Sequence, residues 1–129
     1  MATFLLDTSV IIDAINGKRN RNQSLLALAE QGHLLSCCPI NVAEVYAGLR
    51  AKEEPRTTAL LASLELFPIS FPVAELAGRL KRDHSRKGKT LSLADTIIAA
   101  VALHNHLTLI TDNTRDFPME GLALYSLPE

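Results

Sequence analysis

The sequence has few aromatic residues, little cysteine and no excess of either charge. Trp is absent and aromatic residues make up 5% of the 129 positions, so the core must consist mainly of Leu, Ile, Val and Ala. Thirteen basic residues against 14 acidic ones give a net charge of -1. Taken as a whole, this balance argues against a strongly basic nucleic-acid binder and a polybasic membrane anchor.

The two cysteines and the apolar segments also exclude several classes. Cys37 and Cys38 are adjacent, which strains a mutual disulfide, and two cysteines are too few for a four-ligand zinc site. No basic segment precedes the apolar start of the chain, and the longest uncharged apolar stretch, residues 96–103, is too short to span a bilayer. We expect free buried thiols and a cytoplasmic protein that does not interact with membranes. The length predicts a single domain over residues 1–129.

Short apolar runs alternate with helical patterns along the chain. The runs predict strands at residues 3–6, 33–38, 67–70, 107–111 and 123–126. The helical patterns lie at residues 10–15, 22–31, 40–50, 55–66, 72–84 and 96–105. This alternation predicts an α/β fold with a mostly parallel central sheet and helices on both faces. In such sheets, ligands bind beyond the carboxyl ends of the strands.

Acidic residues lie where that rule places an active site. Asp7 and Asp112 each follow an apolar run, while Glu44 and Asp95 lie on largely apolar helical segments. Each has an ordinary explanation: Asp7 as a helix cap, Asp95 in a capping box with Ser92, Asp112 in a turn and Glu44 facing solvent. Four unrelated explanations at one edge of a sheet are less economical than one shared site.

Clustered carboxylates repel one another unless a cation neutralises them. Mg²⁺ or Mn²⁺ suits oxygen ligands and would activate water for hydrolysis of a phosphodiester. Hydroxyl and amide side chains next to the acids are placed to hydrogen-bond the carboxylates, metal waters or phosphate. These are Thr8, Ser9, Thr111 and Asn113.

Four segments in this order resemble the PIN-domain ribonucleases, and in particular the VapC-type toxins of bacterial toxin–antitoxin pairs. They read D-T-S-V-I-I-D at 7–13, P-I-N-V-A-E-V-Y-A-G-L at 39–49, L-S-L-A-D-T-I-I-A-A at 91–100 and L-I-T-D-N-T-R-D-F at 109–117. The resemblance implies a three-layer α/β/α fold and a metal-dependent endoribonuclease. It also implies that Asp7, Glu44 and Asp95 hold the metal.

The fourth acid is not fixed by the resemblance. In many PIN domains the third position of the last segment is acidic, but here it is Asn113. Asp112 and Asp116 both remain available as catalytic carboxylates, and we favour Asp112 as the fourth metal ligand while keeping Asp116 beside it.

The resemblance also implies partners. It implies a homodimer, and a hetero-oligomer with a VapB-like antitoxin whose C-terminal segment lies over the active-site groove. It implies cleavage of structured RNA, such as tRNA or ribosomal RNA.

Basic residues cluster in two segments near Asp7 and Asp95. The residues predicted to bind RNA are Lys18, Arg19, Arg21, Arg82, Arg86, Lys87 and Lys89. They could form a basic rim that guides phosphates towards an acidic metal centre, or simply a solvated helix face. Since aromatic residues are scarce, recognition of backbone and shape is expected rather than base stacking.

Two other functions fit parts of the pattern. A phospho-receiver domain is also small and α/β, but it requires a pair of acids after the first strand and a Lys after a late strand, and this chain has neither. A PIN-like domain that binds RNA or a partner without cutting is the other alternative, although the intact set of acids argues against it.

Overall fold

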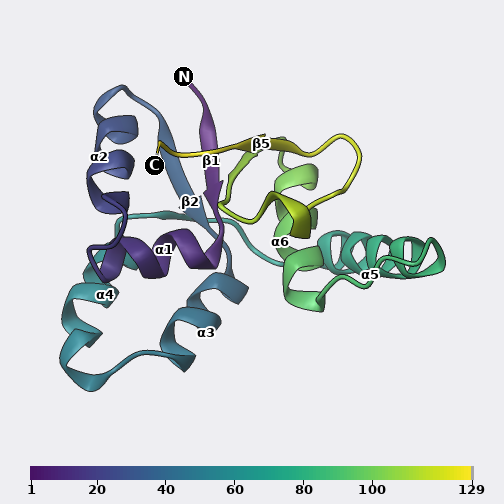
Figure 1. Cartoon of the computed structure of the whole chain (residues 1–129), viewed down its shortest axis with the longest axis horizontal. Helices are drawn as coiled ribbons and strands as arrows, with labels where there is room; N and C mark the ends of the chain where they lie inside the picture. Colours follow the sequence, from purple (N-terminus) through teal and green to yellow (C-terminus); the bar gives the residue numbers. More distant parts are fainter. Residues whose placement is uncertain (129) are drawn as a thin grey trace.

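Five short strands form the centre of the molecule. The computed structural model describes residues 1–128. The strands are β1 (Thr3–Leu6), β2 (Leu34–Cys37), β3 (Glu65–Leu66), β4 (Thr108–Ile110) and β5 (Ala123–Tyr125). They lie in the order β3-β2-β1-β4-β5, and every neighbouring pair is parallel (Figure 1). The carboxyl ends of the central strands therefore meet at one edge of the sheet.

The connections between the strands contain six α-helices. These are α1 (Thr8–Ile15), α2 (Arg21–Glu30), α3 (Pro39–Ala47), α4 (Glu54–Ala62), α5 (Phe71–Arg86) and α6 (Leu93–His104). Two single 3₁₀ turns, η1 (Ala51–Glu53) and η2 (Thr114–Asp116), precede α4 and follow β4. The hydroxyls of Ser70 and Ser92 accept backbone N–H groups at the starts of α5 and α6, as N-cap residues do.

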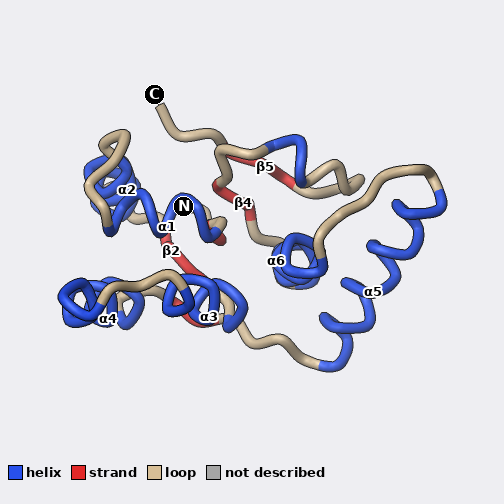
Figure 2. Tube along the Cα trace, turned by 60° about the horizontal axis from the view of Figure 1, so that its bottom comes forward, coloured by secondary structure: helices blue, strands red, loops and turns tan. Residues whose placement is uncertain are grey.

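Two separate apolar clusters cover the two faces of the sheet. Phe4 and Leu6 of β1 pack in one cluster with residues of α1 and α2, whereas Leu5 packs in the other with residues of α5 and α6. Successive side chains of a strand point to opposite faces, so the apolar run of β1 contributes to both clusters. Figure 2 shows α1, α2 and α4 on one side of the strands, with α5 and α6 on the other.

The observed architecture confirms the predicted three-layer α/β/α fold, with a sheet that is fully rather than mostly parallel. The strand predicted at residues 67–70 is wrong. The edge strand is Glu65–Leu66, and the preceding helix ends at Ala62. Both strand residues are exposed, and only their pairing with Ser36 and Cys37 of β2 defines them. A strand of two exposed residues leaves no apolar run in the sequence, so this criterion could not locate it.

The two cysteines are buried free thiols, as expected. Burial raises the pKa of the Cys37 thiol to about 11, which keeps it protonated. Within residues 1–128, no helix combines the length and the hydropathy needed to cross a membrane. The expected domain limit at residue 129 lies just outside the described part of the chain.

Candidate active site

Asp7 lies at the carboxyl end of β1 and caps the start of α1. Its residue is only 5% exposed. One carboxylate oxygen accepts the backbone N–H of Thr8 at 2.8 Å, and the other accepts the hydroxyl of Thr111 at 2.7 Å. These two hydrogen bonds fix the orientation of the carboxylate, yet each oxygen keeps a further lone pair for a cation.

A chain of three polar side chains connects α1 to α3. The side chain of buried Asn41 accepts the Cys38 N–H at 2.8 Å and donates to the Thr8 hydroxyl at 2.9 Å. That hydroxyl in turn donates to Oε1 of Glu44 at 2.6 Å. Asn41 therefore positions Thr8, and Thr8 holds the Glu44 carboxylate near the start of α1.

The role of Asn41 was missed in the sequence reasoning. The available signal was its place three residues after Cys38, in the first turn of a helix that opens with Pro39. Asn at this position can bond back to the residue before the helix, as the third residue of a capping box does.

Asp95 lies in the first turn of α6, where its backbone N–H donates to the Ser92 hydroxyl at 3.1 Å. The capping interaction expected from the sequence is therefore present. The side chain of Asp95 is nevertheless in the field of other acids. Burial is the main cause that raises its pKa, and the charges of Asp116 and Glu44 raise it further.

The same electrostatic pattern surrounds Asp7. Burial raises the pKa of Asp7 most, the hydrogen bonds from Thr111 and Thr8 oppose this, and the charges of Asp95 and Glu44 add to the rise. The charge of Glu44 thus acts on both Asp7 and Asp95, and the charge of Asp116 acts on Asp95; we refer to these four acids as the carboxylate cluster. Such a cluster is stabilised by a bound cation.

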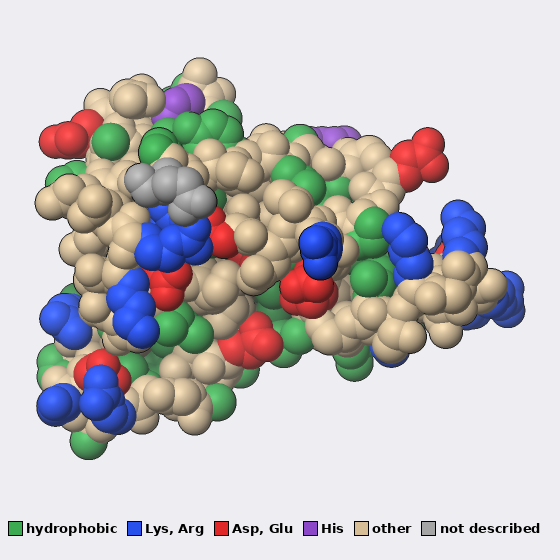
Figure 3. Space-filling model, viewed as in Figure 1, with side chains coloured by type: hydrophobic (Ala, Val, Ile, Leu, Met, Phe, Trp, Pro, Cys, Tyr) green, Lys and Arg blue, Asp and Glu red, His purple; other side chains and the backbone are tan. Residues whose placement is uncertain are grey.

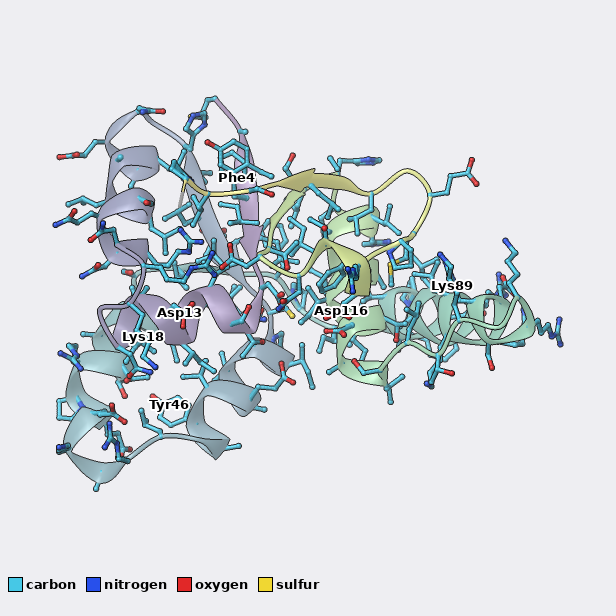
Figure 4. All side chains as sticks on the ribbon, viewed as in Figure 1. Phe4, Asp13, Lys18, Tyr46, Lys89 and Asp116 are labelled. Carbon is cyan, nitrogen blue, oxygen red and sulfur yellow. The ribbon has the colours of Figure 1, made fainter. Side chains whose placement is uncertain are left out.

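The acids of the cluster do not form a complete coordination shell for a metal ion in this structure. Within residues 1–128, no three side chains of His, Cys, Asp or Glu stand close enough to hold one metal ion between them. The oxygen donors nevertheless have the chemistry that Mg²⁺ and Mn²⁺ require. Asp116 is exposed on η2, and Figure 4 shows it beside α6.

Asp112 is directed elsewhere. Its carboxylate pairs with Arg21, with contacts of 2.7 Å from Nη2 and 3.3 Å from Nε, and also lies 3.3 Å from Nη1 of Arg19. The side chain of Arg21 is fully buried, so it has no surface for RNA contact and the sequence interpretation of this residue is corrected. A charge run does not show that one of its members pairs with an acid 91 positions away.

Of the hydroxyl and amide side chains predicted to support the acids, some contact a carboxylate directly and others act through a neighbouring residue. Thr8 and Thr111 bond the carboxylates of Glu44 and Asp7 directly. Asn113 acts one step further out, because its backbone N–H donates to the Thr111 hydroxyl at 2.9 Å. Its side chain is 3.5 Å from the Ser9 hydroxyl, a long contact.

The remaining basic residues are exposed and lie on two sides of the cluster. Lys18 and Arg19 follow α1, whereas Arg82 and Arg86 are on α5, with Lys87 and Lys89 just beyond it. In Figure 4, Lys18 and Lys89 lie on opposite sides of Asp116, and Figure 3 shows basic groups towards both ends of the molecule with acidic groups between them. This arrangement is compatible with the predicted rim, and RNA contact stays a prediction.

The fold and the site together consist of a parallel α/β sheet with the buried Asp7 carboxylate at the carboxyl end of its central strand, where the charges of Glu44 and Asp95 act on it. Residues 4–118 match the family model described as PIN domain. The chain therefore belongs to the PIN-domain family. It is 31% identical over 115 residues to Ribonuclease VapC10 of Mycobacterium tuberculosis, covering 89% of this chain and 86% of that protein, and it is a member of the VapC family.

Solved structures show the same fold. VapBC2 from Rickettsia felis, bound to a DNA fragment from its promoter, matches with a TM-score of 0.85 at 24% identity, over 96% of this chain and 98% of that one. A toxin–antitoxin complex from Klebsiella pneumoniae matches with a TM-score of 0.75 at 32% identity, over 97% and 96%. The fold similarity thus extends over nearly the whole chain.

Proposed function

We propose that this chain is a metal-dependent endoribonuclease that acts as the toxin of a VapBC-type pair. The observation that carries the proposal is the buried Asp7 carboxylate, held by two hydrogen bonds within the field of Glu44 and Asp95. A buried acid surrounded by like charges is costly for stability and is typical of a functional site. Relatives named as VapC ribonucleases support the reaction class.

Asp7, Glu44 and Asp95 are the proposed metal ligands, with Asp116 as the fourth carboxylate. We favour Asp116 over Asp112 because the charge of Asp116 acts on Asp95, while Asp112 is engaged by Arg21. Asp7 is fixed by its two hydrogen bonds. Side-chain rotation of Glu44, Asp95 and Asp116 would therefore complete the site around it.

Mg²⁺ or Mn²⁺ in this cluster would lower the pKa of a water molecule and offset negative charge on a phosphoryl oxygen. The chain supplies orientation. Thr111 and the Thr8 N–H hold Asp7, and the Thr8 hydroxyl holds Glu44. Water would then form a bond to phosphorus and lose a proton to solvent, while the bond to the leaving ribose oxygen breaks and that oxygen takes up a proton from solvent, so no side-chain nucleophile is required.

The proposed substrate is structured RNA, such as tRNA or ribosomal RNA. Lys18 and Arg19 on one side, and Arg82, Arg86, Lys87 and Lys89 on the other, would contact its phosphates. The proposed partners are a second copy of the chain and a VapB-like antitoxin, within a cytoplasmic complex. Similar solved structures described as VapBC and toxin–antitoxin complexes support the antitoxin partner.

RNA cleavage by the purified protein tests the proposal. With Mg²⁺ or Mn²⁺ the protein should cut a structured RNA internally, and EDTA should stop the cutting. The matched control is Asp7→Asn, which keeps the size of the side chain and removes its charge. Undiminished cutting by the folded variant would falsify the assignment, as would cutting that persists in EDTA. Mapping of cellular RNA ends after brief expression, with the same control, identifies the substrate.

A further inference from the structure

A second basic surface begins at Lys18 and continues on residues that have no role so far. Between the C-terminal end of α1 and the connection from α3 to α4 there is an open cavity of about 580 Å³. Four cationic side chains line it: Lys18, Arg50, Lys52 and Arg56. Asn16, Glu53 and Pro55 complete the lining. The cavity is therefore strongly polar, unlike the neighbouring clusters that form the core.

One carboxylate, that of Glu53, lies among these cations, and its charge is already engaged. It accepts the Arg50 backbone N–H at 3.0 Å and lies 3.3–3.4 Å from the guanidinium of the same residue. These contacts, together with the charge of Arg56, hold the pKa of Glu53 below its usual range, so it stays ionised. The lining thus keeps an excess of positive charge.

The cations themselves are accessible. Lys18, Lys52 and Arg56 are exposed, and the side chain of Arg50 is 71% exposed while that of Glu53 is only 12% exposed. The acid is directed inward and the bases outward. Two further acids are near in sequence, Asp13 and Glu54, but neither lines the cavity. A ligand approaching from solvent would therefore meet cations first.

The cavity has a defined position relative to the carboxylate cluster. Asp7 caps the N-terminal end of α1, and Lys18 follows its C-terminal end. A helix of eight residues is roughly 12 Å long, since each residue rises about 1.5 Å. Figure 4 shows Lys18, which lines the cavity, on the side of Asp116 away from Lys89.

We propose that this cavity is a binding site for backbone phosphates of the RNA substrate, remote from the scissile bond. The inference rests on the proposed function and extends it. Lys52 and Arg56 are the proposed contact residues, and neither belongs to the basic residues predicted from the sequence to bind RNA. Phosphate oxygens are the ligands that exposed Lys and Arg side chains recognise, and such contacts position a nucleic acid without reading its sequence.

The salt dependence of RNA binding tests this site. Binding of a fluorescently labelled RNA hairpin is measured by anisotropy in EDTA, so that no cutting occurs, with wild type and with Lys52→Ala/Arg56→Ala. Each lost phosphate contact makes the slope of log K against log[salt] shallower by about 0.7 on a single strand and about 0.9 on a duplex. We expect weaker binding and a slope shallower by about 1.4–1.8 for the double variant on the hairpin.

Arg79→Ala is the matched control for Arg56→Ala. Both arginines are exposed on helices near an acid, since Arg79 pairs with Glu75 on α5 at 3.1 Å. Arg56→Ala should make the slope shallower by about 0.7–0.9, whereas Arg79→Ala should leave it unchanged. Circular dichroism and thermal melts check that each variant is folded.

The outcomes separate this inference from the proposed function. Equal affinity and slope for the folded double variant and wild type overturn the phosphate site, even if wild type cuts RNA in an Asp7-dependent manner. An acidic peptide is the alternative ligand for a cationic cavity. If the double variant binds such a peptide more weakly than wild type does, while its affinity for RNA is unchanged, the phosphate site is also overturned. If RNA binding weakens as expected but cutting does not depend on Asp7, the phosphate site stands and the proposed reaction fails.

Discussion

Arg21 and Asp112 form a buried ion pair that joins the start of α2 to the end of β4. The Arg21 guanidinium makes two contacts with the carboxylate, and its Nη1 also donates to the carbonyl of Pro128 at 2.7 Å. Asp112 follows Thr111, which bonds Asp7. The pair thus anchors both the C-terminal segment and the loop that orients the central acid of the site.

Removing one partner of this pair should destabilise the protein strongly. Arg21→Met leaves the Asp112 carboxylate, whose side chain is only 13% exposed, without its main partner. Breaking a buried pair in this way costs about 3–5 kcal/mol. Urea unfolding monitored by circular dichroism measures the change. The exposed pair of Arg79 and Glu75 is the control, since Arg79→Ala should cost at most about 1 kcal/mol. Equal effects of the two changes would contradict a structural role for Arg21.

Asp112 and Asp116 should behave differently when neutralised. Asp116→Asn removes an exposed charge, so we expect little change in stability. Because this charge acts on Asp95, we expect RNA cleavage to fall at least about tenfold, which corresponds to about 1.4 kcal/mol in the activation barrier. Asp112→Asn should lower stability and leave cleavage by the folded fraction largely intact. Cleavage assays well below the melting temperature of each variant decide this. The reverse pattern would restore Asp112 as the fourth carboxylate.

The choice between Asp112 and Asp116 shows which part of the site could not be predicted from the sequence. Asp7, Glu44 and Asp95 could be selected as candidates because strand ends and apolar flanking residues mark them locally, and the charges of Glu44 and Asp95 act on Asp7 in the structure. Asp112 and Asp116 lie in the same short segment, and no local pattern distinguishes them. Only the tertiary pairing of Asp112 with Arg21 separates their environments.

The strands also differ in how well the sequence predicted them. The apolar runs of β1 and β4 lie near the predicted positions because these strands are buried on both faces and need apolar side chains throughout. The two exposed residues of β3 have no such requirement, so the strand was predicted too late in the chain. Asn41 shows the corresponding limit at the site, because its link to Thr8 spans 33 positions.

Neutralising Asp7 should stabilise the protein in metal-free buffer at neutral pH. The folded protein raises the pKa of Asp7, so the charged form is disfavoured by folding, and stability is lost as the pH rises through the folded pKa. Asp7→Asn removes this cost. Urea unfolding in EDTA should show a higher midpoint for the variant at pH 7, with the difference shrinking as the pH falls towards 4.

A bound metal ion should make wild type more stable than Asp7→Asn. At a concentration 100-fold above its dissociation constant, a metal bound only to the folded state stabilises it by about 2.7 kcal/mol. Wild type should therefore gain several degrees in melting temperature with Mn²⁺, and Asp7→Asn should gain much less. An equal gain in both proteins would show that Asp7 does not contribute to metal binding.

The Thr8 hydroxyl offers a test of how the site is held together. Thr8→Val keeps the shape of the side chain but removes the donor to Glu44 and the acceptor for Asn41. Loss of a group that orients a metal ligand typically lowers metal affinity or activity by about 10–100-fold. The Mn²⁺ concentration for half-maximal RNA cleavage should rise by this factor, and Thr8→Ser, which keeps the hydroxyl, should restore it. Ser9→Ala is the neighbouring control, because among residues 1–128 the Ser9 hydroxyl makes only the long contact with Asn113. A merely structural role for Thr8 would lower the unfolding midpoint and leave the Mn²⁺ requirement of the folded variant unchanged.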